Sequence, residues 1–233
     1  MHMIGITWLG HSTFELRLES GEVLLFDPWL EGNPAHPAGH ALSRVDAVLV
    51  THGHFDHIAH AAVVAKQFGA VLVANYEVCQ YLSGKGVTTT SPMNKGGSQV
   101  VCGVRVSMTH ALHSSGIEDD GKLLYGGEAA GFVLELPDRR TLYFAGDTDV
   151  FGDMALIHDL YRPELAFLPI GDLFTMGPRQ AELACRMLKP RKVIPMHYGT
   201  FPPLIGRPEQ LADRIKDMDC EVWPLEAGKP VHW

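Results

Sequence analysis

The segment His52-Gly53-His54-Phe55-Asp56-His57 holds four side chains that can bind a metal ion. His52 and His54 are two residues apart, so both side chains point to the same side of an extended segment. Asp56 and His57 follow where the chain turns toward an expected helix. Neutral imidazole and carboxylate are suitable ligands for zinc and similar divalent ions. Because four such ligands cannot easily share one small ion, the spacing predicts two neighbouring ions.

Further ligand-type residues directly follow expected strands elsewhere in the chain: His113, Asp147 and His197. Ligands commonly collect at the carboxyl ends of strands in α/β proteins. His110 lies close to His113 and is an alternative to it. The remaining histidines fit no such pattern and are expected in loops or on the surface: His2, His36, His40, His60, His158 and His232.

The elements that must position these residues are strands mixed with helices. Short apolar or alternating runs predict strands over 4–9, 13–18, 23–26, 45–50, 71–74, 100–101, 104–108, 130–136, 141–145, 165–169, 192–196 and 221–223. Helical spacing and end signals predict helices over 58–68, 76–82, 152–161, 178–188 and 208–217. Residues 27–44 form a loop rich in Pro, Gly and His, and structureless loops of this length are uncommon unless they are functional.

This element pattern predicts an α/β fold with two sheets and helices outside them, a four-layer αββα sandwich. We expect residues 1–233 to form a single domain. A chain of 233 residues buries enough apolar surface to fold without a disulfide or a structural metal. A metal ion bound here is therefore expected to be catalytic.

The composition argues against several classes of partner. The formal net charge is −8 and no run of Lys or Arg occurs, so nucleic acid is not an expected partner. The four cysteines are far apart, which predicts reduced, mostly buried thiols in a cytoplasmic protein. We expect no signal peptide, because the N-terminus lacks a basic and an apolar region. We expect no membrane partner, because no apolar stretch approaches the ~18 residues of a membrane span.

The chain resembles the metallo-β-lactamase superfamily over essentially its whole length. The superfamily signature H-x-H-x-D-H appears as His52-x-His54-x-Asp56-His57, and the later ligands occur in the right order. The resemblance implies the metallo-β-lactamase-like fold and two metal ions, with Asp147 bridging them. It assigns the remaining ligands as follows: to the first ion His52, His54 and His113, and to the second ion Asp56, His57 and His197.

Asp27 matches a superfamily carboxylate that supports ligand histidines from behind. The alternative is simple turn chemistry before Pro28. Four further segments resemble the metal-dependent hydrolase branch that is similar to L-ascorbate-6-phosphate lactonase: Trp8-Leu9-Gly10-His11-Ser12, Pro169-Ile170-Gly171-Asp172, Phe174-Thr175-Met176-Gly177-Pro178 and Met196-His197-Tyr198-Gly199-Thr200. This branch places the histidine that matches His11 near the metals, whereas the alternative is a structural turn histidine.

The expected activity is that of a metal-dependent hydrolase. A hydroxide bound to two divalent ions would attack a small anionic ester, lactone or phosphorylated metabolite. Zinc is expected first, with manganese, iron or nickel as alternatives. Asp56 is expected to orient the hydroxide or relay its proton, and His11 is the second catalytic candidate. No partner base is recognisable for the neighbouring serines, so a serine nucleophile is not expected.

Other functions stay open at this point. A phosphodiesterase or nuclease would keep the same metal chemistry on a different substrate, although the acidic balance argues against it. A non-catalytic metal-binding sensor is the alternative from another class, although no ligand position is missing. A di-iron oxidoreductase would need a flavin partner. The chain could also form a homo-oligomer.

Overall fold

The computed structural model describes residues 3–233, which divide into two compact units. The first unit comprises 3–94, Ser114–Glu128 and Leu225–Trp233, and the second comprises Lys95–His113 and Ala129–Pro224. Each unit contains one seven-stranded sheet. The single domain expected over residues 1–233 stays a prediction.

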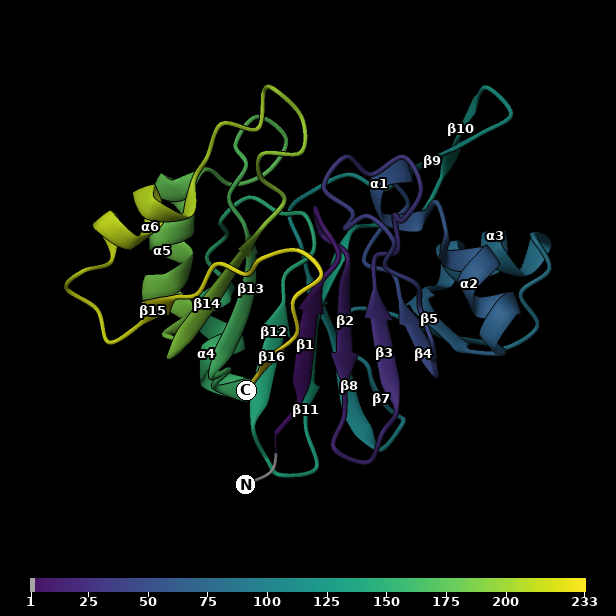
Figure 1. Cartoon of the computed structure of the whole chain (residues 1–233), viewed down its shortest axis with the longest axis horizontal. Helices are drawn as coiled ribbons and strands as arrows, with labels where there is room; N and C mark the ends of the chain where they lie inside the picture. The colour runs from purple at the N-terminus through teal and green to yellow at the C-terminus, as the bar shows by residue number, and fades with distance from the viewer. Residues whose placement is uncertain (1–2) are drawn as a thin grey trace. The chain divides into compact units, whose positions relative to one another are not determined.

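The sheet of the first unit has the strand order β16-β1-β2-β3-β4-β5-β6. Neighbours from β16 to β3 pair antiparallel, and those from β3 to β6 pair parallel. Its strands are β1 (Gly5–Trp8), β2 (Phe14–Arg17), β3 (Val23–Phe26), β4 (Ala47–Leu49), β5 (Val71–Asn75), β6 (Thr90–Met93) and β16 (Val231–His232). Its helices are α1 (Phe55–Ile58), α2 (Ala61–Phe68) and α3 (Tyr76–Gly84). The strands β9 (Gly116–Asp119) and β10 (Lys122–Tyr125) form a separate hairpin (Figure 1).

The sheet of the second unit has the strand order β15-β14-β13-β12-β11-β8-β7. It too has an antiparallel half, from β7 to β12, and a parallel half, from β12 to β15. Its strands are β7 (Ser98–Val101), β8 (Val104–His110), β11 (Ala130–Glu135), β12 (Thr141–Phe144), β13 (Leu165–Pro169), β14 (Lys192–Met196) and β15 (Glu221–Val222). Its helices are α4 (Met154–Tyr161), α5 (Pro178–Leu188) and α6 (Pro208–Arg214).

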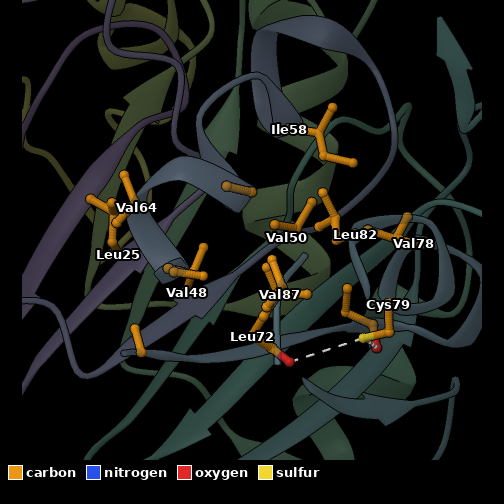
Figure 2. Close-up of a cluster of buried hydrophobic side chains, with 14 of the residues drawn as sticks. Leu25, Val48, Val50, Ile58, Val64, Leu72, Val78, Cys79, Leu82 and Val87 are labelled. Atoms are coloured by element: carbon orange, nitrogen blue, oxygen red, sulfur yellow. Dashed lines mark hydrogen bonds between the residues drawn. The ribbon is translucent and has the colours of Figure 1, made fainter. Parts of the chain in front are cut away.

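The core of the first unit lies between the parallel strands and the helices. Leu25, Val48 and Leu72 come from three neighbouring strands and are fully buried. Val64 from α2 and Leu82 from α3 pack into the same cluster (Figure 2). This packing fixes the helices on the sheet because removing apolar surface from water is the dominant favourable term in folding.

The second unit has an equivalent core. Val133, Tyr143 and Val193 face it from the sheet, while Ile157 and Leu188 face it from α4 and α5. The cysteines of the chain are all reduced: Cys79 and Cys185 are buried, whereas Cys102 and Cys220 are half-buried.

Most predicted elements are confirmed, and the bounds of β3, β13, β14 and α5 agree with the prediction. The helix predicted over 58–68 is confirmed only as α2 from Ala61 to Phe68, because the separate helix α1 ends at Ile58. The break occurs at His60, whose backbone N–H donates to the carbonyl of Pro28 at 2.9 Å instead of continuing the helical ladder. The loop over 27–44 is confirmed as a segment without helix or strand.

The elements β6, β16 and the β9–β10 hairpin are absent from the prediction. β6 is a polar edge strand containing Pro92, and β16 has only two residues. All four residues of β10 are exposed, so it lacks the apolar alternation that marks a half-buried strand. The Asp120-Gly121 pair does indicate this hairpin in the sequence, since Asp-Gly favours a two-residue hairpin loop. Both residues have positive φ in the structure, as that loop requires.

Val64 and Val63 form a matched pair on α2, with exposed fractions of 2% and 55%. We expect Val64→Ala to lower the free energy of unfolding by about 1–3 kcal/mol, because it removes buried methyl groups and leaves a cavity. Val63→Ala carries the same change in helix propensity without the cavity, and should stay within about 0.5 kcal/mol. Urea denaturation measures both values. Equal losses in the two variants would contradict the packing of α2 on the sheet.

Candidate metal centre

Several of the candidate residues stand at sharp bends directly after strands. His11, Asp27 and His197 have φ angles of 55°, 42° and 54°. These angles lie in the left-handed region, which side chains other than glycine rarely adopt. Such strain persists only where the surroundings hold it, and it is concentrated at functional sites.

The bend at His197 depends on a glycine in the second unit. A Cβ atom placed on Gly171 would lie 2.0 Å from the carbonyl oxygen of His197. Only a residue without a side chain therefore allows the chain after β13 to pass this close to the chain after β14. Gly171 belongs to one of the branch motifs in the sequence, and this contact gives that motif a physical reason.

In the first unit, the signature segment leaves β4 and enters α1. His52 and His57 are fully buried, Asp56 is 9% exposed, and His54 is half-buried. The Nε2 atom of His52 lies 3.0 Å from Nδ1 of His54. The two rings meet edge to face, with centroids 4.6 Å apart. The prediction that His52 and His54 point to one side is confirmed.

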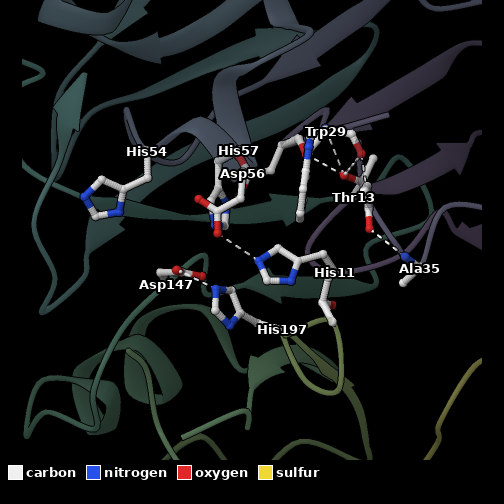
Figure 3. Close-up of polar contacts among 12 residues, drawn as sticks. His11, Thr13, Trp29, Ala35, His54, Asp56, His57, Asp147 and His197 are labelled. Atoms are coloured by element: carbon white, nitrogen blue, oxygen red, sulfur yellow. Dashed lines mark hydrogen bonds and ion pairs between the residues drawn. The ribbon is translucent and has the colours of Figure 1, made fainter. Parts of the chain in front are cut away.

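His11 joins this group from the turn after β1. Its side chain is fully buried, and its Nε2 atom lies 3.0 Å from Oδ2 of Asp56 (Figure 3). The rings of His11 and Trp29 meet edge to face, with centroids 5.3 Å apart. One ligand atom each from His11, Asp56 and His57 lies within 4.8 Å of the others. His11 is therefore part of the cluster, while its chemical role stays a prediction.

Asp27 supports the group from behind through one buried carboxylate. Its Oδ1 accepts the backbone N–H of Thr51 at 2.8 Å, and its Oδ2 accepts the Thr51 hydroxyl at 2.7 Å. The same Oδ2 lies 2.8 Å from Nδ1 of His57. Burial raises the pKa of Asp27, while His57 and Thr51 favour its charged form. The contact leaves Nε2 as the nitrogen of His57 available for a ligand, as expected for a supported metal histidine.

Sequence reasoning did not identify several residues that hold the signature segment. The Thr51 hydroxyl lies 3.0 Å from Nδ1 of His52, and the Ser115 hydroxyl accepts the backbone N–H of Gly53 at 3.0 Å. The Ser114 hydroxyl lies 3.3 Å from Nε2 of His54. Both serines were expected to neighbour the site, but a supporting role was not predicted for them. No local sequence signal marks the two serine contacts, because each joins residues about 60 positions apart.

His60 has a defined structural role, although it was expected to be an ordinary loop or surface residue. Its Nδ1 atom accepts the backbone N–H of Leu30 at 3.2 Å. Burial lowers the pKa of His60 and so favours the neutral ring, which is the form that can accept this bond. His60 therefore holds the start of the 27–44 loop against the helices of the first unit.

In the second unit, His113, Asp147 and His197 lie together. Oδ2 of Asp147 lies 3.0 Å from Nε2 of His197 (Figure 3) and 3.6 Å from Nε2 of His113. Asp147 and His197 are buried. They follow β12 and β14, the two parallel strands that flank β13. One carboxylate oxygen thus faces two imidazole nitrogens, an arrangement suited to a shared ligand.

His110 lies apart from this group. Its side chain is at the exposed end of β8, where Nδ1 lies 3.0 Å from Nζ of Lys95. Its ring meets Phe151 edge to face, with centroids 5.1 Å apart. His113 contacts Asp147 instead, with Nε2 lying 3.6 Å from Oδ2 of that carboxylate.

The donor sets fit divalent ions. Within each unit the grouped ligand atoms are imidazole nitrogens and carboxylate oxygens, with no thiolate. Such donors suit zinc, manganese, iron and nickel alike, so they do not select one metal. Among residues 3–233, no helix is long and apolar enough to cross a membrane.

Comparisons with known proteins agree with this fold. Residues 23–198 match the model of the beta-lactamase superfamily domain. A UPF0173 metal-dependent hydrolase of Solibacter usitatus is 63% identical over 228 residues, which cover 98% of this chain and 99% of the relative. A second relative with that name, from Koribacter versatilis, is 48% identical and covers 96% of each chain.

A solved structure gives the same result. A metallo hydrolase from the hyperthermophilic archaeon Ignicoccus hospitalis superposes with a TM-score of 0.87 and 32% identity, covering 99% of this chain and 98% of its own. The α/β fold with two large sheets and helices is therefore that of the metallo-β-lactamase superfamily, which confirms the predicted fold class. The protein is a metal-dependent hydrolase of this superfamily. Within it, the chain belongs to the UPF0173 metal-dependent hydrolase family.

Asp27→Ala tests the support behind His57. Loss of the carboxylate frees the His57 ring to rotate, so we expect metal affinity to fall about 10–100-fold. Competition with a chelator of known affinity measures it. Asp46→Ala is the control, since Asp46 accepts the Val23 N–H at 2.8 Å at the opposite end of β4. If Asp27→Ala and Asp46→Ala both keep native circular dichroism and lose metal affinity equally, Asp27 does not have this supporting role.

His113→Ala and His110→Ala test the choice between the two histidines. We expect His113→Ala to lower the metal bound per chain, because its imidazole faces Asp147. His110→Ala should keep the wild-type metal content, because His110 contacts Lys95 and Phe151 instead. Elemental analysis of dialysed protein gives the metal content. If His110→Ala loses metal and His113→Ala does not, the metal ligand is His110 and not His113.

Proposed function

We propose that this protein hydrolyses a small anionic ester, lactone or phosphorylated metabolite at a centre of two divalent metal ions. The observation that carries the proposal is the buried group of His11, Asp56 and His57, with Asp27 bound behind it. A carboxylate and imidazoles held this rigidly are set for metal-assisted chemistry, because ligand orientation is fixed before binding.

The resemblance of sequence motifs assigns the ligands to the two ions. It gives Asp147 to both ions, and the contacts of Asp147 with His113 and His197 within the second unit agree with a shared carboxylate. The remaining ligands are assigned as follows: His52, His54 and His113 to the first ion, and Asp56, His57 and His197 to the second. Zinc is the first candidate for both positions, with manganese, iron or nickel as alternatives.

When bound, two such ions would supply Lewis acidity and lower the pKa of a water molecule toward neutrality. We assign to Asp56 the role of orienting that water or relaying its proton. His11 Nε2 lies 3.0 Å from Oδ2 of Asp56. We assign His11 the role of positioning Asp56 and stabilising its charge.

The proposed substrate class follows from charge and resemblance. Divalent ions are the largest local charges in such a site, so they favour a phosphate or carboxylate despite the formal net charge of −8. The branch motifs resemble those of enzymes similar to L-ascorbate-6-phosphate lactonase, which supports phosphorylated sugar lactones and related esters by analogy. The negative net charge of the chain supports a small molecule over nucleic acid as the substrate.

A substrate panel tests the proposal, with lactones, carboxylic esters, phosphodiesters and short RNA assayed in zinc and in manganese. We expect turnover of a small anionic ester or lactone, loss of turnover on chelation, and recovery when metal is restored. Asp147→Ala should reduce the rate at least about 100-fold, because ligands matter no less than the groups that support them.

Asp149→Ala is the matched control, since Asp149 is exposed and accepts the backbone N–H of Val150 at 2.7 Å. It should retain the wild-type rate and metal content. Cleavage of RNA without activity on any small substrate would replace the proposal with a nuclease. Full metal loading without turnover of any compound would replace it with a metal-binding sensor.

A further inference from the structure

The β9–β10 hairpin of the first unit carries an exposed apolar strand. Figure 1 shows the hairpin projecting from the body of this unit. Leu123, Leu124 and Tyr125 of β10 have exposed fractions of 80%, 38% and 75%. Within residues 3–233, β10 pairs only with β9, so its second edge is open. An exposed apolar edge of this kind is a template for pairing with another chain.

The open edge of β10 presents the backbone groups of Leu123 and Tyr125. The N–H of Gly126 donates to the carbonyl of Ser115 at 2.9 Å, so these two residues form a hydrogen-bonded pair of the hairpin. Such pairs recur at every second residue of an antiparallel ladder, so Leu124 also turns its N–H and C=O toward β9. The residues between them, Leu123 and Tyr125, turn theirs to the open edge.

Leu123 and Tyr125 also share one face of the hairpin, because side chains alternate along a strand. A Cβ atom placed on Gly116 of the facing strand would lie 2.7 Å from the Leu123 side chain. Leu123 therefore fills the space that the glycine leaves open, and together with Tyr125 it forms an apolar stripe. Leu124 points to the opposite face with Ile117, its partner in the register.

We propose that β10 pairs antiparallel with β10 of a second copy of this chain, which joins the two hairpins into one four-stranded sheet. The two-fold axis passes at Leu124, so this residue lies opposite its own copy. Leu123 lies opposite Tyr125 of the partner subunit, and the same pair recurs on the other side of the axis. The inference concerns assembly and does not depend on the proposed hydrolysis.

Backbone and side chains select the same register. Leu123 and Tyr125 hold the open-edge N–H and C=O groups, so opposing them makes two hydrogen-bonded pairs across the axis. Each pair also sets an aromatic side chain beside an aliphatic one, which stabilises a sheet. An axis at Leu123 would leave Tyr125 opposite Gly121 in the turn, and both of these pairs would be lost.

Charge complementarity favours a second copy as the occupant of this edge. Opposite Gly126 the register places Lys122 of the partner subunit. A Cβ atom on the adjacent Gly127 would lie 2.6 Å from Oε2 of Glu77, so this carboxylate lies at the end of β10. The pairing therefore brings an ammonium group toward a carboxylate at both ends of the shared ladder, where opposite charges are favourable.

The other edge of the hairpin lacks this complementarity. Glu118 is the residue of β9 that lies opposite Leu123, so its backbone faces the outer edge of β9. Glu118 is exposed, and Asp119 and Asp120 follow it. Two copies of β9 would bring these carboxylates together, and like charges on opposing strands are destabilising. The interface is therefore expected at β10 and not at β9.

A cysteine placed on the two-fold axis tests the register. Leu124 and its copy form a non-hydrogen-bonded pair, whose Cα atoms lie about 4.5 Å apart in antiparallel sheets. This separation is within the range of a disulfide. We expect the full-length Leu124→Cys variant to form a disulfide-linked dimer under mild oxidation. A non-reducing gel shows the dimer, and dithiothreitol should return it to monomer.

Leu123→Cys is the matched control, since Leu123 is more exposed than Leu124. In the proposed register it lies diagonal to its own copy, at about 7–8 Å, which is beyond the usual reach of a disulfide. Leu123→Cys and wild type, which keeps its four native cysteines, should stay uncross-linked. Cross-linking of Leu123→Cys that equals or exceeds that of Leu124→Cys would overturn this register.

Leu123→Glu and Leu160→Glu test the association itself, because both leucines are exposed, at 80% and 74%. Leu160 lies on α4 of the second unit. A single short strand buries less than a standard interface, so we expect a dimer that dissociates on dilution. Sedimentation velocity at increasing concentration should show wild type and Leu160→Glu shifting from monomer to dimer.

Leu123→Glu should raise the dissociation constant of the dimer at least about tenfold, because the change acts twice in a two-fold interface. Circular dichroism checks that the variant keeps the native fold. A wild type that stays monomeric at every concentration would overturn the proposal. A dimer that Leu123→Glu leaves intact would overturn it as well.

Discussion

The buried carboxylate of Asp27 is the interaction on which the geometry of the first unit's metal-ligand group depends. A carboxylate removed from water is costly unless hydrogen bonds compensate it. Three contacts do so here, from the Thr51 N–H, the Thr51 hydroxyl and the His57 ring. They tie together the end of β3, the end of β4 and the start of α1. The orientation of His57 is therefore fixed by strand pairing and not by its own helix.

This interaction is possible only because of the parallel register of β3 and β4. Phe26 pairs with Leu49, and the backbone N–H of Asp27 donates to the carbonyl of Leu49 at 3.0 Å. Asp27 then bends into the left-handed region, which turns its side chain toward Thr51. The second unit repeats the principle, since Asp147 and His197 follow β12 and β14 of its own parallel half. In both units, the parallel strands bring residues distant in sequence to one edge.

Local sequence predicted those parts of the molecule that depend on local chemistry. The strand 23–26 and the helix 178–188 have clear apolar patterns, and both were placed correctly. The His52–His57 cluster was recognisable because its ligands are close in sequence. The roles of Thr51, Ser115 and His60 were not predictable, because each bonds a partner that only the tertiary fold brings near. The break at His60 has the same origin, since the carbonyl of Pro28 takes its N–H.

The glycine within the signature shows how the two faces of the segment are divided. In an extended segment, His52 and His54 share one side and Gly53 points to the other. A Cβ atom on Gly53 would lie 2.5 Å from the Ile117 side chain, and the Gly53 N–H donates to the Ser115 hydroxyl. Ile117 belongs to β9 and is buried, so the base of the exposed hairpin packs directly on the back of the ligand segment. The histidines face the site because the opposite face is occupied, and any side chain at position 53 would push the segment away from this support.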